Sequence, residues 1–282
     1  MSLPKYEFTL QDVLQEKHIS QDEITELRIW MPTVNLPVIS DEMILTFIIA
    51  CRRDIEGAKR ALTAYFLCKN RSPEIFNDRD IDSEELSFTT NVIYHASMPV
   101  ETDDECVVHM FKLNDTKYYN FHFNAVAKLC FMLVDISLNR KSPPSGLKVV
   151  IDAKGAGLMY LTRMKLKVLR KLLEYLQEAM PMNMKEIHVL NTILLVDKII
   201  FMLKPFMKPE LYKMLHLHPN NTNLEEFSQN YIPKKCLPSD YGGELPSFEE
   251  LNKKTIERYR ELKDFFESEE RMRKEWSESI NQ

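Results

Sequence analysis

Few residues in this chain could perform chemistry, and they are scattered. Asp152 ends the apolar run VVID and could act as a catalytic carboxylate, although a residue at such a position more often caps the next turn. Gly155-x-Gly157 follows it, as in a dinucleotide-binding fingerprint. The third glycine of that fingerprint would fall at Tyr160, so nucleotide binding is not indicated.

Two histidines, His216 and His218, stand together in LHLHPN. If this segment is a strand, their side chains alternate between its two faces, and that geometry disfavours a shared metal ion. No G-x-S-x-G, C-x-x-C or P-loop motif occurs anywhere in the sequence. We therefore expect a protein that is not an enzyme and needs no cofactor or metal.

Gly242 and Gly243 stand side by side between Pro238 and Pro246, although the whole chain has only six glycines. Such a pair predicts a turn that needs either a positive φ or a close approach to another segment.

Composition excludes several classes of protein. No run of about 18 apolar residues is present, so a membrane span is not expected, and the N-terminus lacks the apolar core of a signal peptide. Five scattered cysteines fit a reducing cytosol, and we expect a cytoplasmic protein. The net charge of −5 argues against nucleic-acid binding.

The elements that must position these residues change in type near residue 90. Residues before it are predicted to be helical, with Ser40 or Asp41 as an N-cap. After it, helical runs alternate with short β-rich runs, which predicts an α/β domain with a mainly parallel sheet; these runs are ECVVHMFKL, GLKVVIDAKG, KEIHVLNT and KMLHLHPN. Capping-box patterns, Thr222 with Glu225 and Ser247 with Glu250, predict two further helix starts, the second opening a terminal helix over 248–276.

The apolar residues are unusual in kind. The chain has 15 methionines, whose flexible side chains suit either a pocket that adapts to an apolar guest or plain core filling. The segment TILLVDKIIFMLKPF is apolar on more than one face, yet Asp197 and Lys198 interrupt it. This pattern favours a mobile cover over an apolar cavity.

Four segments, in the same order, resemble the CRAL-TRIO family in the branch of alpha-tocopherol transfer protein and its insect relatives. They are ILTFIIACRRDIEGAKRAL, GLKVVIDAKG, KEIHVLNTILLVDKIIFMLKPFM and LHLHPNN…LPSDYGGELPS. The resemblance implies an N-terminal helical domain over 1–90, a lipid-binding domain over 91–250 and a C-terminal helix over 251–282. It also implies that the sheet floors a cavity for one apolar ligand, that a gating helix covers this cavity, and that the glycine pair closes the last turn of the domain.

Matching positions imply the residues of the site. The pocket would be lined by Val149, Ile151, Leu158, Met164, Leu172, Tyr175, Leu176, Met182, Met184 and Ile187, and the gate would comprise Leu194, Leu195, Ile199, Ile200, Phe201 and Met202. We expect Tyr175, on a helix predicted over 159–180, to supply a polar contact; the alternative is a hydroxyl bonded to nearby main chain.

Two groups of family positions differ here. The two pocket serines of the tocopherol carrier fall at Ala127 and Phe131, and the family's phosphoinositide-contacting basic positions fall at Cys51, Asn183, Glu210 and Met214. A different basic group, Arg163, Lys167, Arg170 and Lys171, shares one face of the predicted helix. We expect this face to attract anionic membranes, the alternative being an ordinary solvated face.

The expected function is non-enzymatic binding of a small hydrophobic ligand or lipid and its transfer between membranes, by a cytosolic protein that contacts membranes transiently. The alternative is an adaptor that uses the same fold to bind a protein, with the terminal helix as the partner surface.

Overall fold

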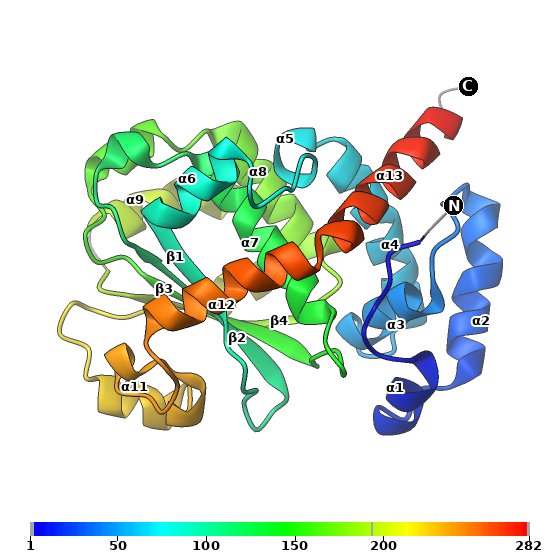
Figure 1. Ribbon diagram of the computed structural model, residues 1–282, viewed down its shortest axis with the longest axis horizontal. Helices are drawn as coiled ribbons and strands as arrows, with labels where there is room; N and C mark the ends of the chain where they lie inside the picture. Colours follow the sequence, from blue (N-terminus) through cyan, green and yellow to red (C-terminus); the bar gives the residue numbers. More distant parts are fainter. Residues whose placement is uncertain (1–2, 193, 281–282) are drawn as a thin grey trace.

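The computed structural model describes residues 3–192 and 194–280 (Figure 1). Its N-terminal third is helical, as the sequence predicts. Side-chain oxygens of Thr9, Ser20, Ser40, Asp54 and Ser83 accept bonds from free backbone N–H groups and so fix where five of these helices begin. The helices of this part are α1 (Leu10–Glu16), α2 (Gln21–Trp30), α3 (Asp41–Ala50), α4 (Ile55–Asn70), α5 (Pro73–Phe76) and α6 (Glu84–Val92).

A five-stranded sheet follows within the described residues, in the order β1-β2-β3-β4-β5. The strands are β1 (Ile93–Ser97), β2 (Cys106–Leu113), β3 (Gly146–Asp152), β4 (Met184–Leu190) and β5 (Leu215–Leu217). Only β1 pairs antiparallel, with β2, so the predicted mainly parallel sheet is confirmed. The sequence reading missed β1, because its five residues continue directly from α6 without a turn signal.

Helices cover the two faces of the sheet unequally. Figure 1 shows α7 (Phe123–Leu138), α8 (Leu166–Glu174) and α9 (Leu194–Leu203) on one side, called the front face here, and α11 (Leu224–Asn230) on the other. The back face is a closed core, in which Val108, Met110 and Val150 pack against Phe227 and Phe248. Among the described residues, no helix is long and apolar enough to cross a membrane.

The helix expected over 159–180 is interrupted. A 3₁₀ turn (Leu158–Thr162) precedes α8, and a π-helical turn (Tyr175–Ala179) ends it. Arg163 and Met164 therefore lie outside α8, and the single face expected for the four basic residues does not form. The aromatic rings of Phe76 and Phe131 each lie 4.7 Å from the ring of Tyr175 and hold it in the π turn.

Two helix-end predictions were wrong in detail and one was right. The terminal helix is two helices, α12 (Phe248–Glu261) and α13 (Lys263–Ile280), because the chain leaves helical geometry at the buried Leu262. Asn223, rather than Thr222, caps α11 and accepts a bond from the Glu225 backbone. The capping box of Ser247 and Glu250 is present.

The glycine pair forms the predicted turn, and each position requires glycine for a different reason. Gly242 has a φ of +73°, which L side chains rarely adopt, and a Cβ on Gly243 would lie 1.9 Å from the Leu237 carbonyl oxygen. Beside this turn, Tyr241 donates to Asp152 at 2.7 Å, and Asp152 also accepts from the Lys154 backbone at 2.9 Å. Asp152 therefore caps a turn, which was the preferred interpretation.

Candidate ligand-binding site

The middle of the front face carries apolar side chains that no element covers fully. The parallel register places Val149 beside Ile187 and Ile151 beside Val189, all on this face. Central strands of a parallel sheet are normally buried on both faces. Ile151 is nevertheless 37% exposed and Val149 and Ile187 are partly buried, whereas Val150, on the back face, is fully buried. The front face therefore offers apolar surface to a guest molecule.

The helix α9 lies along this surface and is apolar on two sides, as the sequence predicts. Its inner side packs Val196 and Ile200 with Ala153 and Val189 of the sheet domain, while Ile199 packs against the main core. On its outer side Phe201 is 81% exposed, and Met202 is partly buried. The side chains of Leu194 and Leu195 lie outside the part of the chain that the structure describes.

The residues expected to line one pocket divide between two places. One group remains near the front face, where Met164 and Leu172 are partly buried against the main core and Leu158 is exposed. The other group, Leu176, Met182 and Met184, lines a separate cavity. No spacing rule could separate the groups, because the π turn that redirects Leu176 has no sequence signature.

This cavity, of about 340 Å³, lies between the helical region and the sheet domain. Its walls come from the end of α3, the start of α4, the π turn and residues 208–214, and they include all four positions matched to phosphoinositide contacts, Cys51, Asn183, Glu210 and Met214. None of the four is basic. The cations at the rim already have partners, since Lys208 lies 2.5 Å from Glu178 and Arg60 lies 3.5 Å from Asp54. The cavity is thus poorly suited to a multiply charged phosphate.

Tyr175 lies deep in the core, 1% exposed, beside a group of buried charges. Burial, together with Asp135 and Glu269, raises the pKa of its hydroxyl well above the usual value. The ammonium of Lys69 lies 5.9 Å from the centre of its ring. Its role as a ligand contact stays a prediction, and the surroundings are those of a structural tyrosine.

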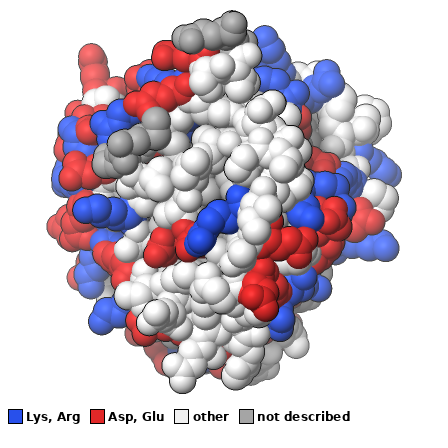
Figure 2. Space-filling view, turned by 90° about the vertical axis from the view of Figure 1, so that its right-hand side faces the viewer, with Lys and Arg blue, Asp and Glu red and all other residues white. Residues whose placement is uncertain are grey.

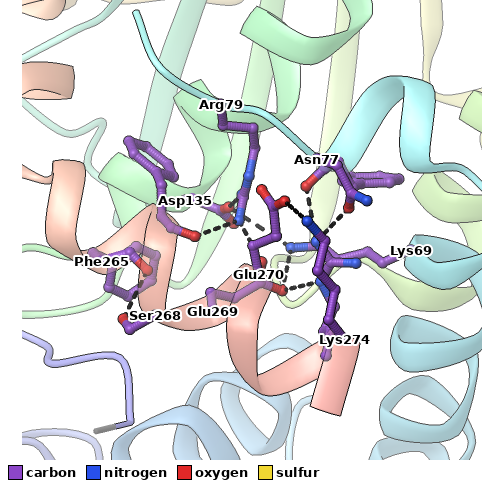
Figure 3. Close-up of polar contacts among 12 residues, drawn as sticks. Lys69, Asn77, Arg79, Asp135, Phe265, Ser268, Glu269, Glu270 and Lys274 are labelled. Carbon is purple, nitrogen blue, oxygen red and sulfur yellow. Dashed lines mark hydrogen bonds and ion pairs between the residues drawn. The ribbon is translucent and has the colours of Figure 1, made fainter. Parts of the chain in front are cut away.

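A buried ion cluster was not predicted from the sequence (Figure 3). It comprises Lys69 of α4, Arg79, Asp135 of α7, and Glu269 and Arg273 of α13. Glu269 accepts from Lys69 at 3.2 Å and from Arg273 at 2.8 Å, and Arg79 bonds both to Glu269 and, at 2.6 Å, to Asp135. Burial alone would raise the pKa of Glu269, but the three cations outweigh it and hold this pKa well below its usual range. Burial lowers the pKa of Lys69 to about 8. One face of α13 is therefore used within the molecule.

The histidine geometry inferred from the sequence was wrong. The rings of His216 and His218 lie 4.9 Å and 5.3 Å from the ring of His188, on one side of the sheet. The alternation rule fails because β5 ends at Leu217, so His218 lies beyond the strand. Within the described residues, no group of three His, Cys, Asp or Glu side chains could hold a metal ion.

The four expected membrane-facing cations are partly occupied by internal contacts. Arg163 donates to the Tyr119 carbonyl at 2.5 Å, Lys171 pairs with Glu74 at 2.7 Å, and Arg170 stacks 4.6 Å above the ring of Phe206. Lys167 is exposed. Around these cations lie exposed apolar side chains, namely Leu158, Met159, Leu166 and Phe201.

Comparisons with known proteins agree with this architecture. A family model described as the CRAL/TRIO domain matches residues 94–243, and one described as a Pinta-like UBA domain matches residues 16–86. Human alpha-tocopherol transfer protein-like is 22% identical over 206 residues, covering 73% of this chain and 59% of that protein. Clavesin-1 of Xenopus laevis is 21% identical over 235 residues, covering 82% of this chain and 69% of that protein.

The chain thus spans only 59% of the length of the tocopherol transfer protein-like relatives it matches. A crystal structure of Sfh5 superposes with a TM-score of 0.45 and 12% identity, over 66% of this chain and 69% of that one. This likeness is too distant to carry an argument.

Proposed function

Because the chain belongs to the CRAL/TRIO family, we propose that it is a non-enzymatic carrier, which encloses one small hydrophobic molecule or lipid and exchanges it at membranes. The observation that carries this proposal is the incompletely covered apolar surface beneath α9, at Val149, Ile151 and Ile187. The same proposal includes the domain division at residues 90 and 250. It also includes a cytoplasmic location with transient membrane contact.

Apolar burial supplies enough free energy for such binding. At roughly 25 cal/mol per Å², a ligand that buries some 300 Å² gains about 7 kcal/mol before the costs of association. A ligand held in this way is selected mainly by shape, so a non-polar guest with few hydrogen-bonding groups is the expected class.

Exposed apolar and basic side chains near the gate support exchange at a membrane. Phe201 projects from α9, and Leu166 and Lys167 project from the start of α8. No acidic residue occurs from Lys154 to Leu173. Apolar side chains flanked by cations are the combination that favours an anionic lipid interface.

An adaptor function is the second candidate, and one surface favours it. Residues 29–40 contain no charged side chain, and Ile29 and Val38 there are 68% and 76% exposed. Figure 2 looks onto the side of the molecule that carries α2 and shows broad uncharged areas with a row of acidic and basic side chains running between them. In an adaptor, this surface would bind a protein and any lipid would be structural.

Organic extraction of the purified chain followed by mass spectrometry tests the binding step. A stoichiometric apolar molecule supports the proposal, and its absence from protein purified out of lipid-rich cells argues against it. Transfer of an NBD-labelled lipid between donor and acceptor vesicles then separates a carrier from an adaptor, because only a carrier accelerates transfer.

A further inference from the structure

Three histidines pack together behind β4 and β5 and have no part in the proposed pocket. This histidine cluster comprises His188 of β4, His216 of β5 and His218. His188 is fully buried, and the ring of Tyr231, at the end of α11, lies 4.9 Å from its ring. The Phe227 ring closes the other side at 5.4 Å.

The hydrogen bonds of the histidine cluster define one neutral arrangement of protons. Glu186 Oε2 lies 3.0 Å from His188 Nε2, and His188 Nδ1 lies 3.1 Å from His218 Nε2. Since a carboxylate only accepts, we assign the proton of His188 to Nε2, which leaves Nδ1 to accept from His218. If both rings gained a second proton, two N–H groups would face each other and this bond would break.

The charged groups around the histidine cluster cannot stabilise several added protons. Glu186 is the anion in contact, and it is shared with Lys148 of β3 at 3.5 Å. Lys148 also lies 3.5 Å from Asp104, which precedes β2. The neighbours from α11, Phe227 and Tyr231, supply aromatic rings and no carboxylate. A second positive charge among three touching imidazoles would therefore lack a partner.

His218 also holds the segment that leads into α9. Its carbonyl oxygen accepts both the backbone N–H and the hydroxyl of Thr192, at 3.0 Å and 2.9 Å. Its own N–H donates to the Val189 carbonyl at 2.9 Å. Thr192 precedes the first residue of α9 by two positions, so the backbone of one cluster histidine anchors the start of the gate.

From this arrangement we propose that the histidine cluster is a proton-sensitive latch, which holds α9 closed while neutral and releases it when the cluster gains protons. Protonation would break the ring-to-ring bond, displace His218 and free Thr192. In the proposed carrier, this latch would trigger release of the ligand, so its biological role rests on the proposed function. The opening of α9 itself can be tested without a ligand.

The direction of the pH effect follows from linkage. Burial is the largest influence on His188 and lowers its pKa to about 4. Burial also lowers the pKa of His218. A released histidine would recover an ordinary pKa near 6.5. The closed form is therefore fully favoured above pH 6.5, and its population relative to the open form decreases as the pH falls below 6.5. For one histidine, the open-to-closed ratio rises about tenfold between pH 7.5 and 5.5.

Hydrogen–deuterium exchange of the full chain at pH 7.5 and 5.5 tests the latch, with labelling times scaled to the intrinsic exchange rate at each pH. We expect amides in 191–192, 194–206 and 214–218 to exchange about tenfold faster at pH 5.5, while those of β2 and β3 change little. His188→Gln and His218→Gln keep a donor near Nε2 but cannot titrate, and either should remove most of the acceleration. Equal scaled rates at both pH values in the wild type would overturn the proposal.

Matched controls separate the histidine cluster from the other histidines. His122→Asn changes an exposed histidine and should leave the response intact. His95→Phe changes a buried histidine of the front face that stacks on Tyr259. A response that survives both cluster variants, or that disappears in His95→Phe, would also overturn the latch. Binding of N-phenyl-1-naphthylamine at pH 7.5 reports on the pocket separately, so its failure would count against the carrier function and not the latch.

Discussion

The carboxylate of Glu269 on α13 accepts a hydrogen bond of 2.8 Å from the hydroxyl of Tyr65 on α4, although 204 residues separate the two in sequence. Around this bond, the buried ion cluster joins the N-terminal helices, α7 of the sheet domain and the terminal helix. The cluster holds three cations and two anions. Because the buried cations outnumber the buried anions, loss of an anion should destabilise the fold more than loss of a cation.

Glu269→Gln should destabilise the protein strongly. The substitution leaves Lys69, Arg79 and Arg273 with only Asp135 to balance them, and stranding a buried charge costs about 3–5 kcal/mol. Urea unfolding followed by circular dichroism would show a lower midpoint with an unchanged slope. Glu267→Gln, on the exposed side of the same helix, is the matched control and should stay within about 0.5 kcal/mol of wild type.

Lys69→Met should be tolerated much better, and its effect should depend on pH. Because burial lowers the pKa of Lys69 to about 8, the folded state loses this proton before the unfolded state does. Stability contributed by Lys69 therefore rises with pH above 8. The free energy of unfolding of wild type, minus that of Lys69→Met, should increase by about 1.5 kcal/mol from pH 8 to 9.5. A difference that stays flat or falls over this range would contradict a pKa depressed by burial.

Local signals explain why much of the fold was predictable. Each of these signals acts over a few residues, and the structure forms the elements that they indicate. They are the alternation of β-rich and helical runs and the helix caps Ser40, Asp54 and Ser247. The buried ion cluster could not be found in this way, because Lys69 and Glu269 read as ordinary helix-surface residues. Burial and pairing at long sequence separation arise only when the helices pack, and the same holds for the two groups of pocket residues.

Gly243→Ala should be far more damaging than other glycine substitutions. A Cβ at this position would lie 1.9 Å from the Leu237 carbonyl oxygen, and that backbone cannot move without breaking the turn beside Tyr241. We expect a loss of at least about 2 kcal/mol in thermal or urea unfolding. Gly157→Ala is the control, since nothing lies within 4 Å of its added Cβ and its φ is −144°. Similar losses for both would remove the steric explanation.

Phe201→Asp should reduce vesicle transfer of an NBD-labelled lipid more than binding of N-phenyl-1-naphthylamine in solution. Phe201 projects outward from α9, so it meets lipid only when the protein docks. The resemblance also places Ile200 in the gate, but Ile200 packs inward with Ala153, Val189 and Val196. We now expect Ile200→Asp to impair both activities. An equal loss of both in Phe201→Asp would mean that α9 is ordinary core.

Binding to phosphatidylserine vesicles should weaken steeply as salt rises, because the cations beside the gate act through diffuse attraction. Each contributes about 1 kcal/mol near an anionic surface, and this contribution is screened by salt. Reversing two of these charges tests the surface, and Arg163 and Lys167 both belong to the basic group identified in the sequence. The structure makes Lys165 a better choice than Arg163, whose guanidinium is bonded to the Tyr119 carbonyl and whose loss would disturb the fold.

Lys165→Glu with Lys167→Glu should therefore abolish most vesicle binding in a sedimentation assay at low salt, while the thermal midpoint changes little. Both side chains are exposed, Lys167 on α8 and Lys165 as its N-cap, and the charge of Lys167 is only the weakest of several influences that lower the pKa of Glu74 on α5. Lys254→Glu reverses an exposed charge on α12 and serves as the control. Preference among phosphoinositides should follow their charge alone, since Cys51, Asn183, Glu210 and Met214 provide no cation. Binding that ignores salt, or that the double reversal leaves unchanged, would exclude this surface as the membrane contact.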